Sequence, residues 1–380
     1  MFYIRRVNAF SKILFALLII AFSCRREHKA FLTEQGDISA NRFAKGFEII
    51  KTNDSVRLLI KKPFQNAENE KPEYVICQKP SGAQGMNIFH SPVKRVVCMS
   101  TTYLPFIKAL GQENSVVGIS GSRLVYDSLW KKKIENGEIA EVGYEQSLNY
   151  ELLIALRPDV VFVYGVGYET SLPMQKLVSL GIKPVFISEY LENQPLAKTE
   201  WIKVFGLFYN TSDKATAIFD SVAALYIQLS GIIEPLSYRP EVICGLPYKD
   251  TWYVSGGNTY ISRFITDAGG DYIFSYVNND VAAMNTEQVF SVAAKTAIWI
   301  NCGTANTLKE LEMCDKRMKL FSAYKNGQVF NNNKRSNGTG GNDYWESGIL
   351  NPDRILGDLI NIFHPGILQD TSLYYYKRIY

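Results

Sequence analysis

Residues 149–163 read NYELLIALRPDVVFV, and residues 285–299 repeat the pattern as NTEQVFSVAAKTAIW. Each stretch opens with Asn-x-Glu, continues with apolar residues at helical spacing and closes on an apolar run. Such an opening predicts an N-capped helix, and the closing run predicts a strand that is buried on both faces. The same helix–strand unit in both halves of the chain indicates two matched α/β lobes.

Strands and helices alternate around the first unit, which is typical of parallel β-α-β units with both sheet faces covered. Residues 197–209 and 212–231 differ, because they read as helices with no strand between them. The second of these helices would be about 30 Å long, roughly the width of a domain. Alternation resumes after Pro235 and Pro240. We therefore predict an α/β fold of two lobes joined by a long spanning helix, divided into 1–23 (signal peptide), 24–92 (lipid tether and small β extension), 93–196 (N-terminal lobe), 197–234 (helical linker) and 235–380 (C-terminal lobe).

The N-terminus has the pattern of an export signal. Three basic residues precede an apolar run at 13–22 that is too short to span a bilayer. Cys24 follows Ala-Phe-Ser, which resembles the lipobox of bacterial lipoproteins. We expect Cys24 to be lipidated and to tether an otherwise soluble, periplasm-facing protein to a membrane of the cell envelope. The alternative is plain signal cleavage, with Cys24 incidental.

Charge and cysteine usage exclude several functions. The 41 basic and 37 acidic residues give a net charge of +4, and three of the basic residues lie in the leader, so nothing suggests nucleic acid. No Cys/His cluster has metal-ligand spacing, so we expect no metal site. The five cysteines after Cys24 are odd in number and show no disulfide framework, although Cys302 and Cys314 could pair.

Catalytic motifs are also lacking. The Gly-rich stretch NGTGGND at 337–343 has neither the preceding buried strand nor the Lys-Ser/Thr of a phosphate loop, so a flexible loop is the better interpretation. There is no Gly-x-Ser-x-Gly elbow, and the histidines stand at 28, 90 and 364. We predict that the protein is not an enzyme; an exported two-lobed enzyme such as a transferase is the alternative.

Aromatic residues gather where loops leave the predicted strands. Ligands of open α/β sheets bind outside the carboxyl ends of the strands, and apolar and aromatic side chains dominate ligand pockets. Each aromatic residue could instead pack in a core, but the set favours a cleft between the lobes. We predict that the ligand contacts Tyr103, Tyr126, Tyr144, Trp252, Tyr260, Arg335, Tyr344 and Trp345.

The sequence resembles the substrate-binding lipoproteins of ABC importers for ferric siderophores, haem and cobalamin. The resemblance covers roughly 94–365 and rests on stretches such as VGYEQSLNYELLIALRPDVVFV and WYVSGGNTYISRFITDAGG with NTEQVFSVA. It implies two Rossmann-like lobes, a rigid spanning helix and small hinge motion. It also implies a bulky metal-chelate ligand, no cofactor of the protein's own and delivery of the ligand to a membrane permease. The β segment before residue 93 is an addition to the family pattern, and Lys295-Thr296 replaces its usual Pro-Asp.

The resemblance also gives the repeated glutamates a role. Near a helix start, a glutamate is by default a capping or dipole-complementing residue. In the family, glutamates at these two positions dock onto arginines of a two-fold permease, which implies the same for Glu151 and Glu287. Few basic residues lie at the predicted cleft, so a highly anionic siderophore is disfavoured. A hydroxamate-type chelate, cobalamin or haem is left, the last because tyrosines could ligate its iron.

Overall fold

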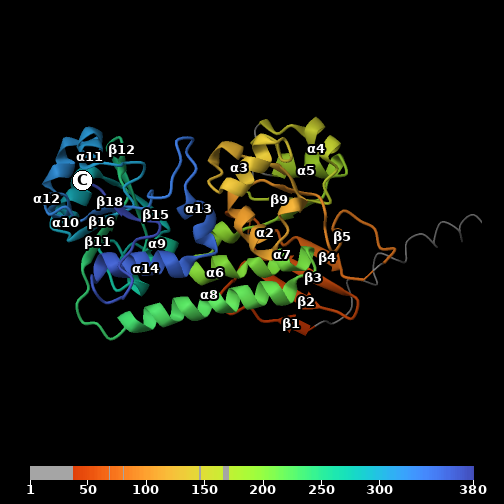
Figure 1. The fold of residues 1–380 in the computed structure, drawn as a ribbon, viewed down its shortest axis with the longest axis horizontal. Coiled ribbons are helices and arrows are strands. Elements are labelled where there is room, and N and C mark those ends of the chain that lie inside the picture. Colours follow the sequence, from red (N-terminus) through yellow and green to blue (C-terminus); the bar gives the residue numbers. More distant parts are fainter. Residues whose placement is uncertain (1–36, 68, 80, 145–146, 166–170) are drawn as a thin grey trace, which may run out of the picture.

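Two lobes lie side by side and are joined along one side by the long helix α8 (Ser212–Ile233), as Figure 1 shows. This computed structural model describes residues 37–380 except 68, 80, 145–146 and 166–170. The predictions for the signal peptide and for Cys24 lie outside the described residues. The α/β fold with a long spanning helix is confirmed.

The N-terminal lobe is built on a parallel sheet of order β10-β9-β6-β7-β8. Its centre is β9 (Val160–Val163), the strand of the repeated motif, which is completely buried. Val161 is in register with Val97 on one side and with Pro184 on the other. The remaining elements are β6 (Val96–Cys98), β7 (Val116–Ile119), β8 (Ala140–Glu141), β10 (Pro184–Phe186), α2 (Leu104–Leu110), α3 (Ser128–Glu135), α4 (Tyr150–Leu156) and α5 (Ser171–Ser179).

Both copies of the motif begin helices as predicted. Asn149 caps α4 by accepting from the Leu152 N–H, and Asn285 caps α10 (Thr286–Ala293) by accepting from the Gln288 N–H. In α10 the Gln288 side chain returns the bond to the Asn285 N–H, which completes a capping box. The two lobes therefore share this start, although α10 is entered from an antiparallel strand.

The N-terminal extension forms a sheet of its own, of order β1-β2-β3-β4-β5. Alternating residues turn inward, as in β3, where Leu58 and Ile60 are completely buried. Phe47 stacks edge-on against Trp201 at a centroid distance of 4.8 Å and joins the sheet to the linker helices. The strands are β1 (Asp37–Ser39), β2 (Phe47–Lys51), β3 (Ser55–Ile60), β4 (Glu73–Cys77) and β5 (Ile88–His90).

The linker contains three helices where two were predicted. The stretch 197–209 is divided at the buried Trp201 into α6 (Pro195–Glu200) and α7 (Ile202–Phe208). Helix α8 turns Ala215, Phe219 and Tyr226 into the core, as its periodicity predicts. It is long and apolar enough to cross a membrane, but here it packs along both lobes as a spine.

The C-terminal lobe departs from simple alternation. Its main sheet has the order β14-β11-β16-β17-β18, with only β18 antiparallel, and a second, antiparallel sheet has the order β12-β13-β15. The stretch EVICGLPY forms two strands, because Gly245 turns the chain at a positive φ of 87°. The elements are β11 (Glu241–Cys244), β12 (Pro247–Tyr248), β13 (Thr251–Ser255), β14 (Asp271–Tyr272), β15 (Val281–Asn285), β16 (Ile298–Ile300), β17 (Val329–Asn331), β18 (Lys377–Arg378), α9 (Tyr260–Asp267), α11 (Leu308–Cys314), α12 (Ser322–Lys325), α13 (Asp343–Glu346) and α14 (Pro352–Phe363).

The cysteine predictions are settled for the described residues. Cys98 and Cys244 are buried thiols, as their strand positions indicate. Cys302 is also buried, whereas Cys314 is exposed, and both are free, so the possible Cys302–Cys314 disulfide is not formed.

Candidate functional site

The carboxyl ends of the N-lobe strands face the C-terminal lobe. The loop after β7, at 120–127, meets the C-lobe segment 335–346, which follows β17 and includes α13. In Figure 1 this segment rises between the lobes beside α3. We call the contact between 120–127 and 335–346 the lobe junction.

A buried carboxylate holds the lobe junction together. Glu346 is 2% exposed, and its two oxygens accept the backbone N–H groups of Tyr126 at 2.6 Å and of Asp127 at 3.0 Å. Burial raises the pKa of Glu346 to about 7; the two N–H donors oppose this shift, whereas Asp343 and Asp127 add to it. One C-lobe side chain therefore binds two consecutive N-lobe amides.

The Gly-rich stretch 337–343 contributes two further bonds across the junction. Asn337 donates from Nδ2 to the Val125 carbonyl at 3.0 Å, and Thr339 donates from Oγ1 to the Arg123 carbonyl at 2.9 Å. A side chain at Gly341 would collide with the Leu124 carbonyl at 2.7 Å. This stretch is therefore no phosphate cradle but a close backbone contact with the other lobe, for which glycine is needed.

Arg335 lies at the junction with its charge already compensated. Its Nε donates to Asp343 at 2.6 Å, and its guanidinium lies over the rings of Tyr126 and Tyr374 at 5.4 and 4.4 Å. Tyr126 is half-buried. Arg335 and Tyr126, two of the predicted ligand contacts, thus lie together, with the cation over the ring of Tyr126.

Two of the predicted aromatic residues are open to solvent beside the junction. Tyr144 is 49% exposed and lies over Gly121, so that a side chain at Gly121 would meet its hydroxyl at 3.6 Å. Trp345 is 58% exposed and packs edge-on against Tyr344 at 4.7 Å. Large exposed aromatic side chains on both sides of a lobe boundary are available to a ligand.

Three of the other predicted contacts pack in the core instead. Trp252 is completely buried; it stacks near Trp299 at 5.9 Å and donates from Nε1 to the Cys244 carbonyl. Tyr103 is equally buried, with its hydroxyl on the Ile187 carbonyl, and Tyr344 is 2% exposed. In this conformation none of the three side chains is open to a ligand, because each lies on the buried side of its strand or helix. We therefore correct the ligand set by removing them.

Tyr260 links the lobes in another way. Its ring is half-buried, and the ammonium of Lys198, on α6, lies over it in a cation–π contact, 4.6 Å from the ring centroid. The ring also packs edge-on against Phe264. Lys198 also donates to the Tyr190 carbonyl at 3.1 Å. Burial lowers the pKa of Lys198, and the nearby Glu189 opposes that shift.

Glu189, three residues after the end of β10, is a second buried carboxylate. One of its oxygens accepts from the Thr102 hydroxyl at 2.8 Å, and the other has no hydrogen-bond partner in the described part of the chain. Burial raises the pKa of Glu189 to about 7 despite Thr102 and Lys198. The described residues hold no group of His, Cys, Asp and Glu that could bind a metal ion.

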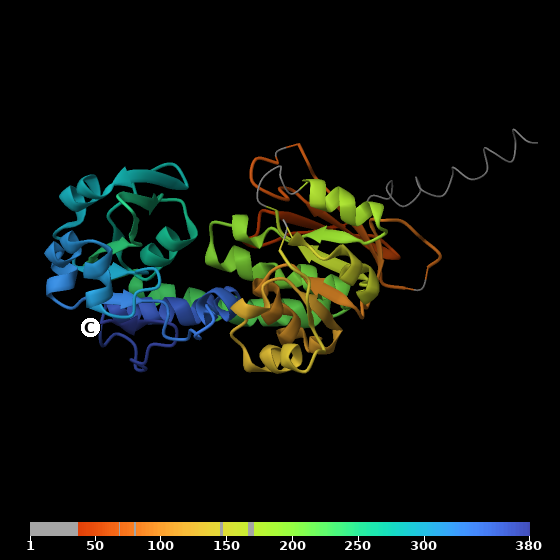
Figure 2. The same ribbon diagram turned by 90° about the horizontal axis from the view of Figure 1, so that it is seen from above.

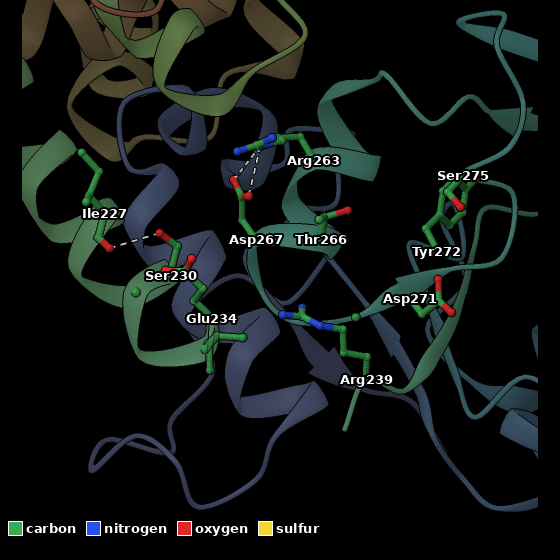
Figure 3. Close-up of a pocket in the computed structure, with 13 residues that line it drawn as sticks. Ile227, Ser230, Glu234, Arg239, Arg263, Thr266, Asp267, Asp271, Tyr272 and Ser275 are labelled. Atoms are coloured by element: carbon green, nitrogen blue, oxygen red, sulfur yellow. Dashed lines mark hydrogen bonds and ion pairs between the residues drawn. The ribbon is translucent and has the colours of Figure 1, made fainter. Parts of the chain in front are cut away.

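A hollow of about 590 Å³ lies elsewhere, between the end of α8 and the C-terminal lobe. Figure 3 shows that Arg263 in it is turned to Asp267, with which it forms an ion pair at 3.0 Å. None of the predicted ligand contacts lines it. Its position at the base of one lobe makes it a surface hollow and not the interlobe site.

Glu151 and Glu287 take matching positions, the second residue of α4 and of α10. Neither serves as a cap, because Asn149 and Asn285 do so. Glu287 has a side chain 84% exposed and only a long 3.9 Å contact with Arg317, which Asp315 and Asp250 already hold. Glu151 is exposed and has no partner among the described residues. Both carboxylates are free to meet another molecule.

Glu346, Glu189 and Lys198 were not predicted from the sequence. Glu346 lies 220 positions from the amide of Tyr126, so no local pattern could reveal the contact. Glu189 and Lys198 carried one usable signal, since both lie in the loop and short helix after a predicted strand end, where binding residues collect.

Known proteins resemble the chain over most of its length. A family model described as periplasmic binding protein matches residues 96–335, more than half of the chain. An uncharacterized lipoprotein of Methanocaldococcus jannaschii is 28% identical over 326 residues, covering 83% of this chain and 75% of the relative.

Solved structures share the fold at low sequence identity. An ABC-type Fe3+-hydroxamate transport system protein from Saccharomonospora viridis matches with a TM-score of 0.54 and 16% identity, over 73% of this chain and 95% of that one. A periplasmic heme-binding protein from Pseudomonas aeruginosa matches with a TM-score of 0.55 and 16% identity, over 72% and 94%.

Proposed function

This chain belongs to the periplasmic binding protein family, and on that premise we propose that it is a membrane-anchored substrate-binding protein that captures a bulky metal chelate and delivers it to an ABC importer. The observation that carries the proposal is the lobe junction at the carboxyl ends of the N-lobe strands, flanked by Tyr144 and Trp345. Ligands of open α/β sheets bind at such ends. Exposed aromatic rings suit the large apolar surface of a chelate.

The ligand class follows from the charges at this place. The Arg335 guanidinium is neutralised by Asp343, so this cation is not available to a highly anionic siderophore. A ferric hydroxamate or cobalamin fits better, and haem stays an alternative, since Tyr144 could approach its iron. Proteins of the same fold are named for Fe3+-hydroxamate transport and for heme. We keep Tyr126, Tyr144, Tyr260, Arg335 and Trp345 as the proposed ligand-binding residues.

Removal of the Trp345 ring tests the place of the ligand. Trp345→Ala should weaken chelate binding by on the order of 1–3 kcal/mol, because a stacked aromatic anchor is lost. Isothermal titration with a ferric hydroxamate, cobalamin and haem measures the change. Tyr238→Ala is the matched control, since Tyr238 is 66% exposed but follows α8 at the base of the molecule. Unchanged affinity in Trp345→Ala and in Tyr144→Ala would place the ligand elsewhere.

The anchor is tested at Cys24. Cys24→Ser should lose acyl label and move the protein from the membrane to the soluble fraction, because diacylation holds a protein on the bilayer through the buried acyl chains. Metabolic labelling with a fatty acid, followed by fractionation, checks both. Continued labelling of the serine variant would contradict lipidation at this residue.

The alternative function, an exported two-lobed enzyme, predicts a different outcome with the same ligands. A binding protein gains thermal stability from its ligand, and the gain grows with the logarithm of ligand concentration above the Kd; it also releases the ligand chemically unchanged. Mass spectrometry of the chelate after prolonged incubation separates the two possibilities, and turnover of any of the three chelates would remove our proposal.

A further inference from the structure

A second, smaller pocket lies where the N-terminal extension, the N-terminal lobe and the C-terminal lobe meet. Its volume is about 220 Å³. The extension contributes Lys45 and Lys62, the loop after β10 contributes Ser188 and its continuation 191–194, and the C-terminal lobe contributes Asn258 just before α9. Figure 2 shows the extension, in red and orange, in the half of the molecule that holds the N-terminal lobe, with the C-terminal lobe on the other side.

The extension wall of the pocket is firmly built. The backbone N–H groups of Arg42, Phe43 and Ala44 donate to the carboxylate of Glu200 at 2.8–3.0 Å. Those of Lys45 and Gly46 donate to Glu192 at 2.8–3.2 Å. Five consecutive amides thus bind two carboxylates, Glu192 of the N-terminal lobe and Glu200 of the linker. Because the main chain is held, the Lys45 side chain is carried at the pocket by an ordered segment.

Gly46 shows how closely the extension wall approaches Trp201 and Glu192. A side chain there would come within 2.8 Å of the Trp201 ring and 3.1 Å of a Glu192 oxygen. The same Glu192 oxygen accepts from Trp201 Nε1 at 3.2 Å. The one carboxylate that lines the pocket is therefore occupied by N–H donors, and its negative charge is offset by them.

The other polar side chains of the pocket have no partners in the described part of the chain. The Ser188 hydroxyl is buried, at 1% residue exposure, and is without a hydrogen-bond partner. Neither lysine forms an ion pair, in contrast to the adjacent Lys61, which binds Glu48 at 2.6 Å. A buried hydroxyl without a partner costs free energy, so such a group points to a ligand. The unpartnered set is Lys45, Lys62, Ser188, Asn193, Gln194 and Asn258.

From this arrangement we infer that the pocket is a second ligand site, for a small anion bearing carboxylate or phosphate oxygens. Every unpartnered side chain can donate a hydrogen bond, and two carry a positive charge. The volume is below the roughly 300–1,000 Å³ of pockets for drug-sized ligands, so a bulky chelate is excluded. The pocket needs the extension, which lies outside the matched family residues 96–335.

Occupancy would tie the lobes together. Asn258 belongs to the C-terminal lobe, whereas the lysines belong to the extension, which is fixed on the N-terminal lobe and the linker. An anion that bridges them favours the arrangement in which these groups converge, since a ligand stabilises the state that binds it better. The extension thereby acquires a role, as half of an effector site.

The test uses the full-length protein and three probes, citrate, malonate and inorganic phosphate, in isothermal titration and thermal unfolding. We expect saturable 1:1 binding of at least one probe, with Lys45→Ala/Lys62→Ala weakening it tenfold or more and Ser188→Ala weakening it less. Lys61→Ala, the matched control outside the pocket, should bind as the unaltered protein does. The double variant should still bind the chelate, because its exposed lysines touch neither the core nor the lobe junction.

Three outcomes would overturn the inference. These are no saturable binding of any of the three probes, equal binding by the double variant, and an equal loss in Lys61→Ala, which would mean general attraction to positive charge. None of these outcomes bears on chelate binding, so the second site and the proposed function can fail separately.

Discussion

Uptake of the chelate is expected to cease when Glu151 and Glu287 are both replaced by alanine, while chelate affinity stays unchanged. The two glutamates are exposed, matched in position on the two lobes and unneeded as helix caps. We propose that each forms a salt bridge with an arginine of a two-fold permease. Rim salt bridges orient a complex and are individually modest and sensitive to salt. Single variants should therefore give intermediate uptake, and the double variant none.

Whole-cell uptake of the labelled chelate, paired with titration of the purified variants, measures both quantities. Glu135→Ala/Glu234→Ala serves as the matched control, because these two exposed glutamates lie at the end of α3 and after α8, away from the helix starts. Normal uptake by the Glu151/Glu287 double variant would reduce both residues to surface carboxylates that complement a helix dipole.

The second large effect is expected at the lobe junction. Glu346→Ala leaves the amides of Tyr126 and Asp127 without their acceptor, and each buried donor left without a partner costs about 1–3 kcal/mol. We expect the junction to open, with hydrogen exchange at these two amides accelerated by an order of magnitude or more. Glu346→Gln, which keeps one acceptor oxygen, should fall between. Unchanged exchange in Glu346→Ala would show that Asn337 and Thr339 suffice.

The pH dependence of unfolding follows from the same carboxylate. The pKa of a glutamate is about 4.5 in the unfolded chain and rises to about 7 for Glu346 and for Glu189 in the folded protein. Between these values the folded protein binds more protons than the unfolded chain, so the free energy of unfolding falls as pH rises from about 4.5 to 7.

His364 acts in the opposite direction, because burial lowers its pKa. The difference between the unaltered protein and Glu346→Gln isolates the glutamate. That difference should change across this pH window in thermal unfolding experiments, and equal pH slopes in both proteins would contradict the raised pKa.

Local patterns predicted the framework well. Each asparagine cap, of α4 and of α10, is encoded within four residues. An all-apolar strand such as β9 is expected in the interior of a parallel sheet, where both of its faces are covered. The long helix was recognisable from the spacing of Ala215, Phe219 and Tyr226. These features depend on neighbours in sequence, which is why they could be predicted.

The site was harder, because it depends on which side of an element faces the other lobe. Trp252 and Tyr253 are neighbours in the same short strand, β13. Trp252 and Val254 turn inward, whereas Tyr253 turns outward. The sequence shows this alternation but not which face is covered. The antiparallel sheet of β12, β13 and β15 was also missed, because its pairing joins residues far apart in the sequence, such as 251 and 285.

The most direct test is to purify the protein from its native membranes under mild conditions and to identify what co-purifies by absorbance and mass spectrometry. We predict one metal chelate per protein, a ferric hydroxamate, a cobalamin or haem, that is released unchanged on unfolding. A protein that arrives without a chelate, binds none of the three when they are added and converts some other small molecule would contradict the proposed function.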